Sequence, residues 1–81
     1  MEITGIKEML TYLVANLVDD PEAIQVNVLE NGNTITLQLR VAAEDMGRVI
    51  GRQGRIAKEI RTLIKAMGLR DDKRVMVDIL D

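Results

Sequence analysis

Two glycines three positions apart enclose a pair of polar residues in the segment Gly51-Arg52-Gln53-Gly54. Glycine lets the backbone turn tightly and leaves no Cβ in the way of a ligand. The residues that follow have a helical pattern, and the start of a helix presents unpaired N–H groups at the positive end of its dipole. Arg52 and Arg55 add positive charge at the same place. The segment therefore predicts an anion site that suits a phosphate group.

A row of basic side chains continues from this loop along the helix that follows. Lys58, Arg61 and Lys65 fall roughly opposite the apolar residues of that helix, which predicts a solvent-facing basic ridge. Residues 48–74 carry nine basic and three acidic groups, a net charge of +6, whereas the rest of the chain carries −8. This division suits a protein that holds an anion on one side while its acidic remainder limits indiscriminate binding.

Both features also have a purely structural interpretation. A Gly-x-x-Gly segment between two helices is often only a turn, and a basic ridge on an exposed helix is often only a solvated face. Their combination at one helix start, together with the division of charge along the chain, favours a binding function.

The composition excludes most enzyme classes. The chain has no Cys and no His, which removes thiolate catalysis, the commonest general base and the commonest zinc ligand. No Walker lysine motif, nucleophile elbow or metal-ligand cluster is present, and the acidic pairs Asp19-Asp20 and Asp71-Asp72 are typical of solvated turns. We therefore expect no enzymatic activity, no cofactor, no metal and no small-molecule substrate.

The chain also lacks the signals of a membrane or secreted protein. No apolar run approaches the roughly 20 residues that a membrane helix needs. The first residues lack the basic region of a signal peptide. We expect a cytoplasmic protein without a membrane partner.

The first half of the chain reads as a helix followed by two strands. Apolar residues at three- and four-residue steps predict an amphipathic helix from about 3 to 18, ended by Asp19-Asp20-Pro21. The period then changes to two at Ile24, and a return strand covers 35–41. Between them, Asn31-Gly32 predicts a two-residue hairpin turn with positive φ at both positions. Because both strands have one apolar and one polar face, helices should cover one side of the sheet only.

Two helices separated by the glycine loop come next. A short one is expected from about 44 to 50, with Glu44 and Asp45 in its first turn, where carboxylates suit the helix dipole. A longer one is expected from about 55 to 67, with Gly68 as its C-terminal stop.

A third strand closes the pattern, because Val75, Val77 and Ile79 alternate with Met76 and Asp78. The order α-β-β-α-α-β predicts an α+β fold, with three helices on one face of a three-stranded sheet. At 81 residues we expect a single domain spanning 1–81.

The segment Val49-Ile50-Gly51-Arg52-Gln53-Gly54-Arg55-Ile56 resembles the Val-Ile-Gly-x-x-Gly-x-x-Ile signature of KH domains. A helix before the first two strands and a strand at the end resemble the type II arrangement of that domain. Over essentially all 81 residues the chain is similar to the KhpA family of small bacterial single-KH proteins. It departs at Arg52, where that family often has Lys, but the positive charge is kept.

The resemblance implies an RNA-binding protein that clamps about four nucleotides of single-stranded RNA at the Gly-x-x-Gly loop. It implies a role in post-transcriptional regulation or as an RNA chaperone. Ten residues are carried over as RNA-binding: Arg48, Val49, Ile50, Gly51, Arg52, Gln53, Gly54, Arg55, Lys58 and Arg61.

Bases are expected in a groove beside the loop, with Val49, Ile50, Ile56 and Val41 as candidate floor residues. A plain core position is an alternative for all four, and an equally good one for Val41 and Ile56. The absence of Phe and Trp argues against an aromatic stacking platform, though not against an aliphatic groove. Tyr12, the only aromatic residue, is expected at the edge of the core or at a partner surface.

The resemblance also implies protein partners. These are a second copy of the chain and a larger KH-containing protein of the KhpB/Jag type. The alternative function is a protein–protein interaction module, in which the basic ridge meets an acidic partner and the Gly-x-x-Gly loop is only a turn.

Overall fold

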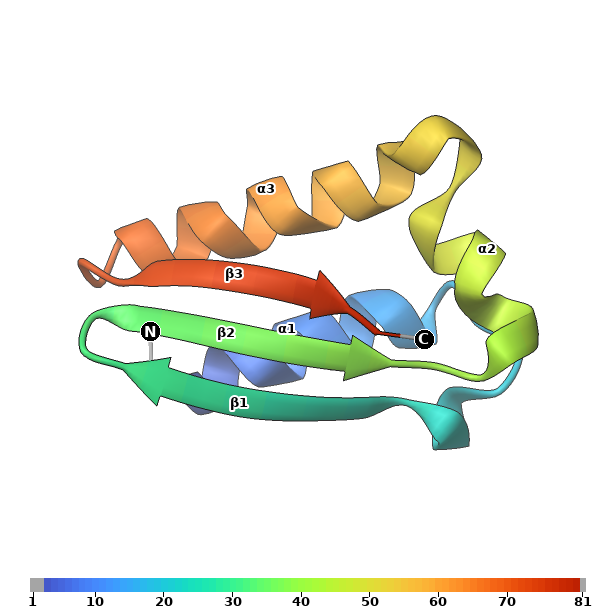
Figure 1. Ribbon diagram of the computed structural model, residues 1–81, viewed down its shortest axis with the longest axis horizontal. Coiled ribbons are helices and arrows are strands. Elements are labelled where there is room, and N and C mark those ends of the chain that lie inside the picture. The colour runs from blue at the N-terminus through green and yellow to red at the C-terminus, as the bar shows by residue number, and fades with distance from the viewer. Residues whose placement is uncertain (1–2, 81) are drawn as a thin grey trace.

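The structure is a computed structural model that describes residues 3–80, and it confirms the order α-β-β-α-α-β (Figure 1). The helices and strands are α1 (Ile3–Ala15), β1 (Gln25–Asn31), β2 (Thr34–Arg40), α2 (Met46–Ile50), α3 (Arg55–Leu69) and β3 (Arg74–Ile79). Three short 3-10 turns join them: η1 (Pro21–Ala23), η2 (Ala43–Asp45) and η3 (Arg52–Gly54).

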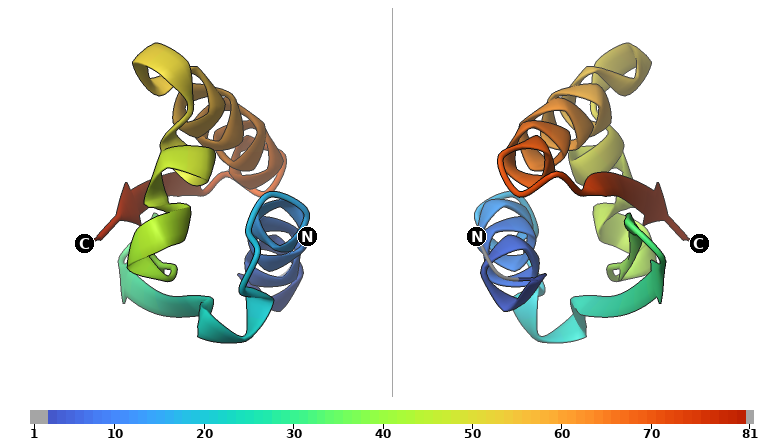
Figure 2. Two further views of the ribbon diagram at one scale, coloured as in Figure 1. Left: turned by 90° about the vertical axis from the view of Figure 1, so that its right-hand side faces the viewer. Right: turned by 90° about the vertical axis from the view of Figure 1, so that its left-hand side faces the viewer.

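The sheet is mixed. Its strands lie in the order β1-β2-β3, with β1 and β2 antiparallel and β2 and β3 parallel. The two-residue period is clear in β2, where Ile35, Leu37 and Leu39 are buried and the residues between them are partly exposed. One face of the sheet is therefore apolar, and α1 and α3 lie across that face (Figure 2).

The core lies between this sheet face and the helices. Leu10 and Val14 of α1 and Ile60 and Ile64 of α3 pack with the buried strand residues in one cluster. Val49 of α2 joins the same cluster, although α2 itself lies at the end of the sheet (Figure 1). Both helices that flank the glycine loop are thus fixed to a common core.

The hairpin turn differs from the prediction. Asn31 pairs with Thr34, so the two turn residues are Gly32 and Asn33, and of these only Gly32 has a positive φ, +62°. Glycine at the first central position is typical of a type II′ turn. The expected positive φ at Asn31 was wrong because that residue still belongs to β1.

The ends of two helices also differ. The first helix ends at Ala15 rather than near 18, and Leu17 N–H donates to Val14 O in a tighter turn at 2.9 Å. Gly68 does not stop α3, which continues to Leu69. A Cβ at Gly68 would lie 2.3 Å from Val75 Cγ2, so glycine here allows α3 to approach β3 closely. The turn into β3 uses Asp72 instead, at φ +56°.

No helix within residues 3–80 combines the length and the apolar character needed to cross a membrane.

Candidate functional site

The glycine loop is a compact turn at one end of the molecule (Figure 1). Gly51, Gln53 and Gly54 all have positive φ, at +76°, +58° and +75°. Gly54 N–H donates to Gly51 O at 3.2 Å, which closes the turn. Left-handed backbone at the non-glycine Gln53 is unfavourable and is typical of functional loops that their surroundings hold in place.

The two glycines have different surroundings. A Cβ at Gly51 would lie 2.6 Å from Cγ1 of Ile56, so this glycine is needed for packing as well as for its φ. A Cβ at Gly54 would meet no atom within 4 Å. Gly54 therefore leaves open space at the start of α3, where a ligand can approach the backbone closely.

The loop directs polar groups to solvent. Arg52 and Gln53 are exposed, and no side chain within the described residues caps the N-terminus of α3. Arg55 Nη2 donates to Gln53 Oε1 at a long 3.5 Å, so this guanidinium lies beside the loop. Two guanidinium groups and the positive end of a 15-residue helix thus meet at one exposed point, an arrangement that suits a phosphate.

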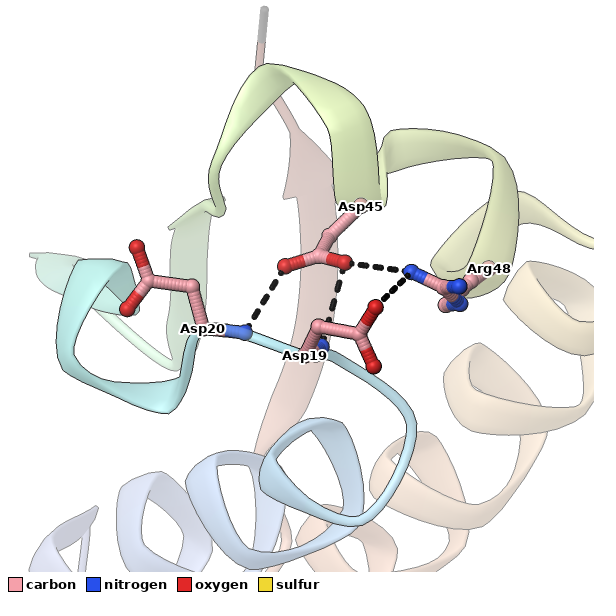
Figure 3. A network of polar contacts seen from close by, with 4 residues as sticks. All are labelled: Asp19, Asp20, Asp45 and Arg48. Carbon is pink, nitrogen blue, oxygen red and sulfur yellow. Dashed lines mark hydrogen bonds and ion pairs between the residues drawn. The ribbon is translucent and has the colours of Figure 1, made fainter.

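A buried carboxylate fixes the element that leads into the loop (Figure 3). Asp45, at the N-cap of α2, has 0% of its surface exposed. Its two oxygens accept the backbone N–H groups of Asp19 and Asp20, each at 3.1 Å. Arg48 Nη1 donates to Asp45 Oδ1 at 2.9 Å and lies 2.8 Å from Asp19 Oδ2. The segment after α1 is thereby tied to α2.

The N–H of Asp19 lowers the pKa of Asp45, with smaller contributions from the N–H of Asp20 and from Arg48, while burial opposes the shift. The expectation for Asp45 was incomplete, because the carboxylate does more than complement the α2 dipole. Asp19 and Asp20 lie in a turn, as expected, but that turn is held by the buried carboxylate.

A groove of about 530 Å³ runs between α3 and β3. Its lining includes Lys58, Arg61 and Lys65 of the predicted basic ridge, and Arg74 from the opposite wall. Asp78 of β3 is the acidic residue of the lining. The groove is thus predominantly basic, and Lys58 lies one turn of helix from the loop.

The backbone of β3 forms part of the groove wall. Arg74 N–H donates to Asn33 O and Leu80 N–H donates to Leu39 O, so the even-numbered positions along β3 bond to β2. The N–H and C=O groups of Val75 and Val77 therefore point away from β2. Arg61 Nε donates to one of them, the carbonyl of Val77, at 3.1 Å.

The structure brings together most of the predicted RNA-binding residues. The loop residues 51–54 and Arg55 form one exposed end, and Lys58 and Arg61 extend from it along the groove. Arg48 faces the other way, toward Asp19 and Asp45.

The candidate floor residues are placed differently from one another. Val49 is 0% exposed and belongs to the core, so its side chain has no access to a ligand. Ile50 is exposed, while Ile56 and Val41 pack partly against the core. None of the four lines the α3–β3 groove, whose apolar wall comes from Val75, Met76 and Val77. The sequence pattern carries no signal for this wall, since a strand's period does not show which helix lies beside it.

A second hollow, of about 400 Å³, lies between α1 and α3. Its lining includes Leu13, Leu17 and Ile56, together with two exposed side chains, Tyr12 at 66% and Leu63 at 44%. Tyr12 therefore lies on an exposed apolar surface between α1 and α3, and its role as a partner contact stays a prediction.

Known proteins of similar sequence match nearly the whole chain. A family model described as the KhpA/KhpB KH domain matches residues 7–79. The chain is 50% identical over 74 residues to the RNA-binding protein KhpA of Clostridium acetobutylicum, covering 91% of this chain and 99% of the relative. It is 45% identical over 75 residues to the RNA-binding protein KhpA of Listeria monocytogenes, covering 93% and 99%.

Among solved structures, the chain is similar to Aquifex aeolicus Era in a complex with GDP and AlF4−. The TM-score is 0.60 and the sequence identity 21%, and the match covers 91% of this chain and 29% of Era. At this identity the likeness concerns the fold alone.

Proposed function

The chain belongs to the KhpA/KhpB family of KH domains, and from this premise we propose that it binds single-stranded RNA at the Gly51–Gly54 loop. The observation that carries the proposal is the exposed loop itself, with two glycines at positive φ, Arg52 between them and, behind them, a helix start that no side chain of the described residues caps. RNA-binding relatives that cover nearly the whole chain support the choice of ligand.

In the proposed complex the loop holds the sugar-phosphate backbone. The open space at Gly54 admits a phosphate to the first N–H groups of α3, and Arg52, Arg55 and Lys58 supply charge around it. The following nucleotides enter the α3–β3 groove, where unstacked bases meet the exposed side chain of Met76 and the backbone of Val75 and Val77. Binding needs no bond-breaking chemistry, so the proposed role is recognition, in post-transcriptional regulation or as an RNA chaperone in the bacterial cytoplasm.

The loop variant Arg52→Asp/Gln53→Asp tests this proposal. Two carboxylates would face the phosphate, while both glycines still make the turn, so RNA binding should be lost and the melting temperature kept. Titration of a labelled single strand and of a perfect duplex of the same composition should show a preference for the single strand in the wild-type protein. Unchanged affinity in a normally folded variant, or tighter binding to the duplex, would contradict the proposal.

The competing function is that of a protein-binding module. In that case the loop substitutions should not change the affinity for the protein partner. We also propose protein partners alongside RNA: a second copy of the chain and a KhpB-type protein. The exposed apolar side chains of Tyr12 and Leu63 support such a contact, because apolar hollows on small proteins often mark interaction surfaces. Light scattering after size-exclusion chromatography, on the chain alone and with the second protein, would test both pairings.

We further propose that the 81-residue chain acts as one KH domain. The family match covers residues 7–79, and the hydrophobic core joins residues from Ile6 to Val77.

A further inference from the structure

Arg61 is held in a different way from the other basic residues of the groove. Its Nε donates to the carbonyl of Val77 on the opposite wall at 3.1 Å, which ties α3 to the free edge of β3. Within residues 3–80 the structure gives this guanidinium no carboxylate partner. With Nε anchored, the four N–H bonds of Nη1 and Nη2 are left to donate at a fixed position.

The same contact changes what the groove wall offers to a base. The N–H and C=O of Val77 both point away from β2, and one of the two lone pairs of the carbonyl oxygen accepts from Arg61. At this point the wall presents mainly donors: the N–H of Val77 and the terminal nitrogens of Arg61. Two adjacent acceptors on a base edge fit these donors, whereas an amino group in place of either acceptor would face a donor.

We propose that Arg61 is a specificity-determining residue that selects bases with two adjacent hydrogen-bond acceptors. The inference rests on the proposed RNA-binding function and adds the class of base that the groove takes. It assigns Arg61 to base reading, while Lys58 and the loop arginines hold phosphates.

The chemistry of the four bases makes the selection specific. The parallel N–H bonds of Nη1 and Nη2 match O6 and N7 of guanine, the commonest bidentate pairing of arginine with a base. They also match the adjacent O2 and N3 of cytosine. Adenine places its N6 amino group beside N7, and uracil separates its two carbonyls by N3–H. Guanine and cytosine are therefore the expected ligands, and adenine and uracil the rejected ones.

The test uses labelled uridine octamers in which one central base is uracil, guanine, cytosine or adenine. Guanine or cytosine should tighten binding by about five- to 150-fold over uracil, the range for one good bidentate pair. In Arg61→Lys the charge stays but the fork is removed, so the ratio between octamers should fall to about one. Lys65→Gln, which removes a charge from the same groove, should weaken all four octamers to a similar degree and keep their ratios.

Replacing guanine by 7-deazaguanine, which lacks the N7 acceptor, tests whether guanine is bound through its O6/N7 edge. Loss of the guanine preference assigns the interaction to the O6/N7 edge, whereas a preference for cytosine alone assigns it to O2/N3. A guanine preference that survives the replacement would overturn the inference, and so would an Arg61→Lys protein that keeps the ratios.

The loop variant Arg52→Asp/Gln53→Asp distinguishes failure of this inference from failure of the proposed function. If wild-type protein binds all four octamers equally while the loop variant binds none, RNA binding stands and base selection by Arg61 is overturned. If wild-type protein binds no octamer, or binds equally well with the altered loop, RNA binding at this site itself fails.

Discussion

Gly51 and Gly54 both have a positive φ, but they differ in ψ (175° and 14°) and in what surrounds them. The difference in surroundings separates packing from ligand access. Gly51 lies against Ile56, whereas Gly54 faces open space. The sequence signature treats the two glycines alike. Their separate roles depend on where the side chain of Ile56 lies, and the spacing of residues in the sequence does not give that position.

Alanine at each glycine should therefore have unequal effects on stability. Gly54→Ala should cost about 1–2 kcal/mol, the penalty of a side chain in the left-handed region. Gly51→Ala should cost about 1–3 kcal/mol more, because its φ of +76° with ψ of 175° is open essentially to glycine alone and its Cβ would lie 2.6 Å from Ile56 Cγ1. Urea denaturation of the two variants measures the difference. Equal midpoints would show that neither the backbone of Gly51 nor its contact with Ile56 adds a cost.

Asp45 should make folding sensitive to acid. Because its pKa is lowered in the folded state, the carboxylate favours folding at pH values above its ordinary 3.8, and this stabilisation is lost as pH falls toward the folded pKa. In Asp45→Asn the melting temperature at neutral pH should be lower, and its decline in acid should be shallower than that of the wild type.

The matched control is Asp19→Asn. It removes the exposed ion pair with Arg48 but keeps the backbone N–H that Asp45 accepts. A small effect is expected, since exposed ion pairs contribute little. If the melting temperatures of the wild type and of Asp45→Asn fall in parallel as the pH is lowered, the carboxylate of Asp45 is not the source of the acid sensitivity.

At the scale of elements, Gly68 sets the distance between α3 and β3, and so the shape of the groove. Alanine there gains about 1 kcal/mol in helix propensity. Its Cβ would lie 2.3 Å from Val75 Cγ2 and 3.1 Å from Lys73 O, which should cost about 1–3 kcal/mol. We expect a net loss of stability in chemical denaturation. Combining Gly68→Ala with Val75→Ala should cost less than the sum of the two single changes.

Gly47→Ala is the matched control, because it too lies in a helix but meets no atom within 4 Å. It should stabilise the protein by about 0.4–1 kcal/mol. If Gly68→Ala stabilises the protein as much as Gly47→Ala does, then α3 and β3 do not depend on their close approach at Gly68.

Most of the elements could be predicted from the sequence, because both periods are clear. The strand around Val75 and Val77 was placed to within one residue of β3, and the α3 start at Arg55 was correct. The parallel pairing of β2 with β3 was not foreseen, since apolar alternation identifies the buried face but not the neighbouring strand. The Asp45 contacts were missed for a related reason: they join residues 25 and 26 positions apart, between segments without a shared pattern.

For the whole molecule, the separation of charge should limit how strongly salt weakens RNA binding. A loop that neutralises about two to four phosphates predicts a slope of log affinity against log salt of roughly −1.4 to −2.8. The −8 outside residues 48–74 should discourage additional interactions with phosphates. Lys58→Ala should reduce the slope by about 0.7, as expected when one phosphate is no longer neutralised. A slope near zero in the wild-type protein would show that electrostatics at this face does not drive binding.

The parallel pairing of β2 with β3 also bears on the order in which the parts of the fold form. Thr34 pairs with Arg74, and the whole α2–α3 segment lies between them in the sequence. Because closing so long a loop costs chain entropy, we expect this pairing to form late. The groove wall that carries Val75 and Val77 exists only when β3 lies beside α3. In the proposed complex the bases therefore have no groove until this last strand of the sheet has docked, which links completion of the fold to the base selection proposed for Arg61.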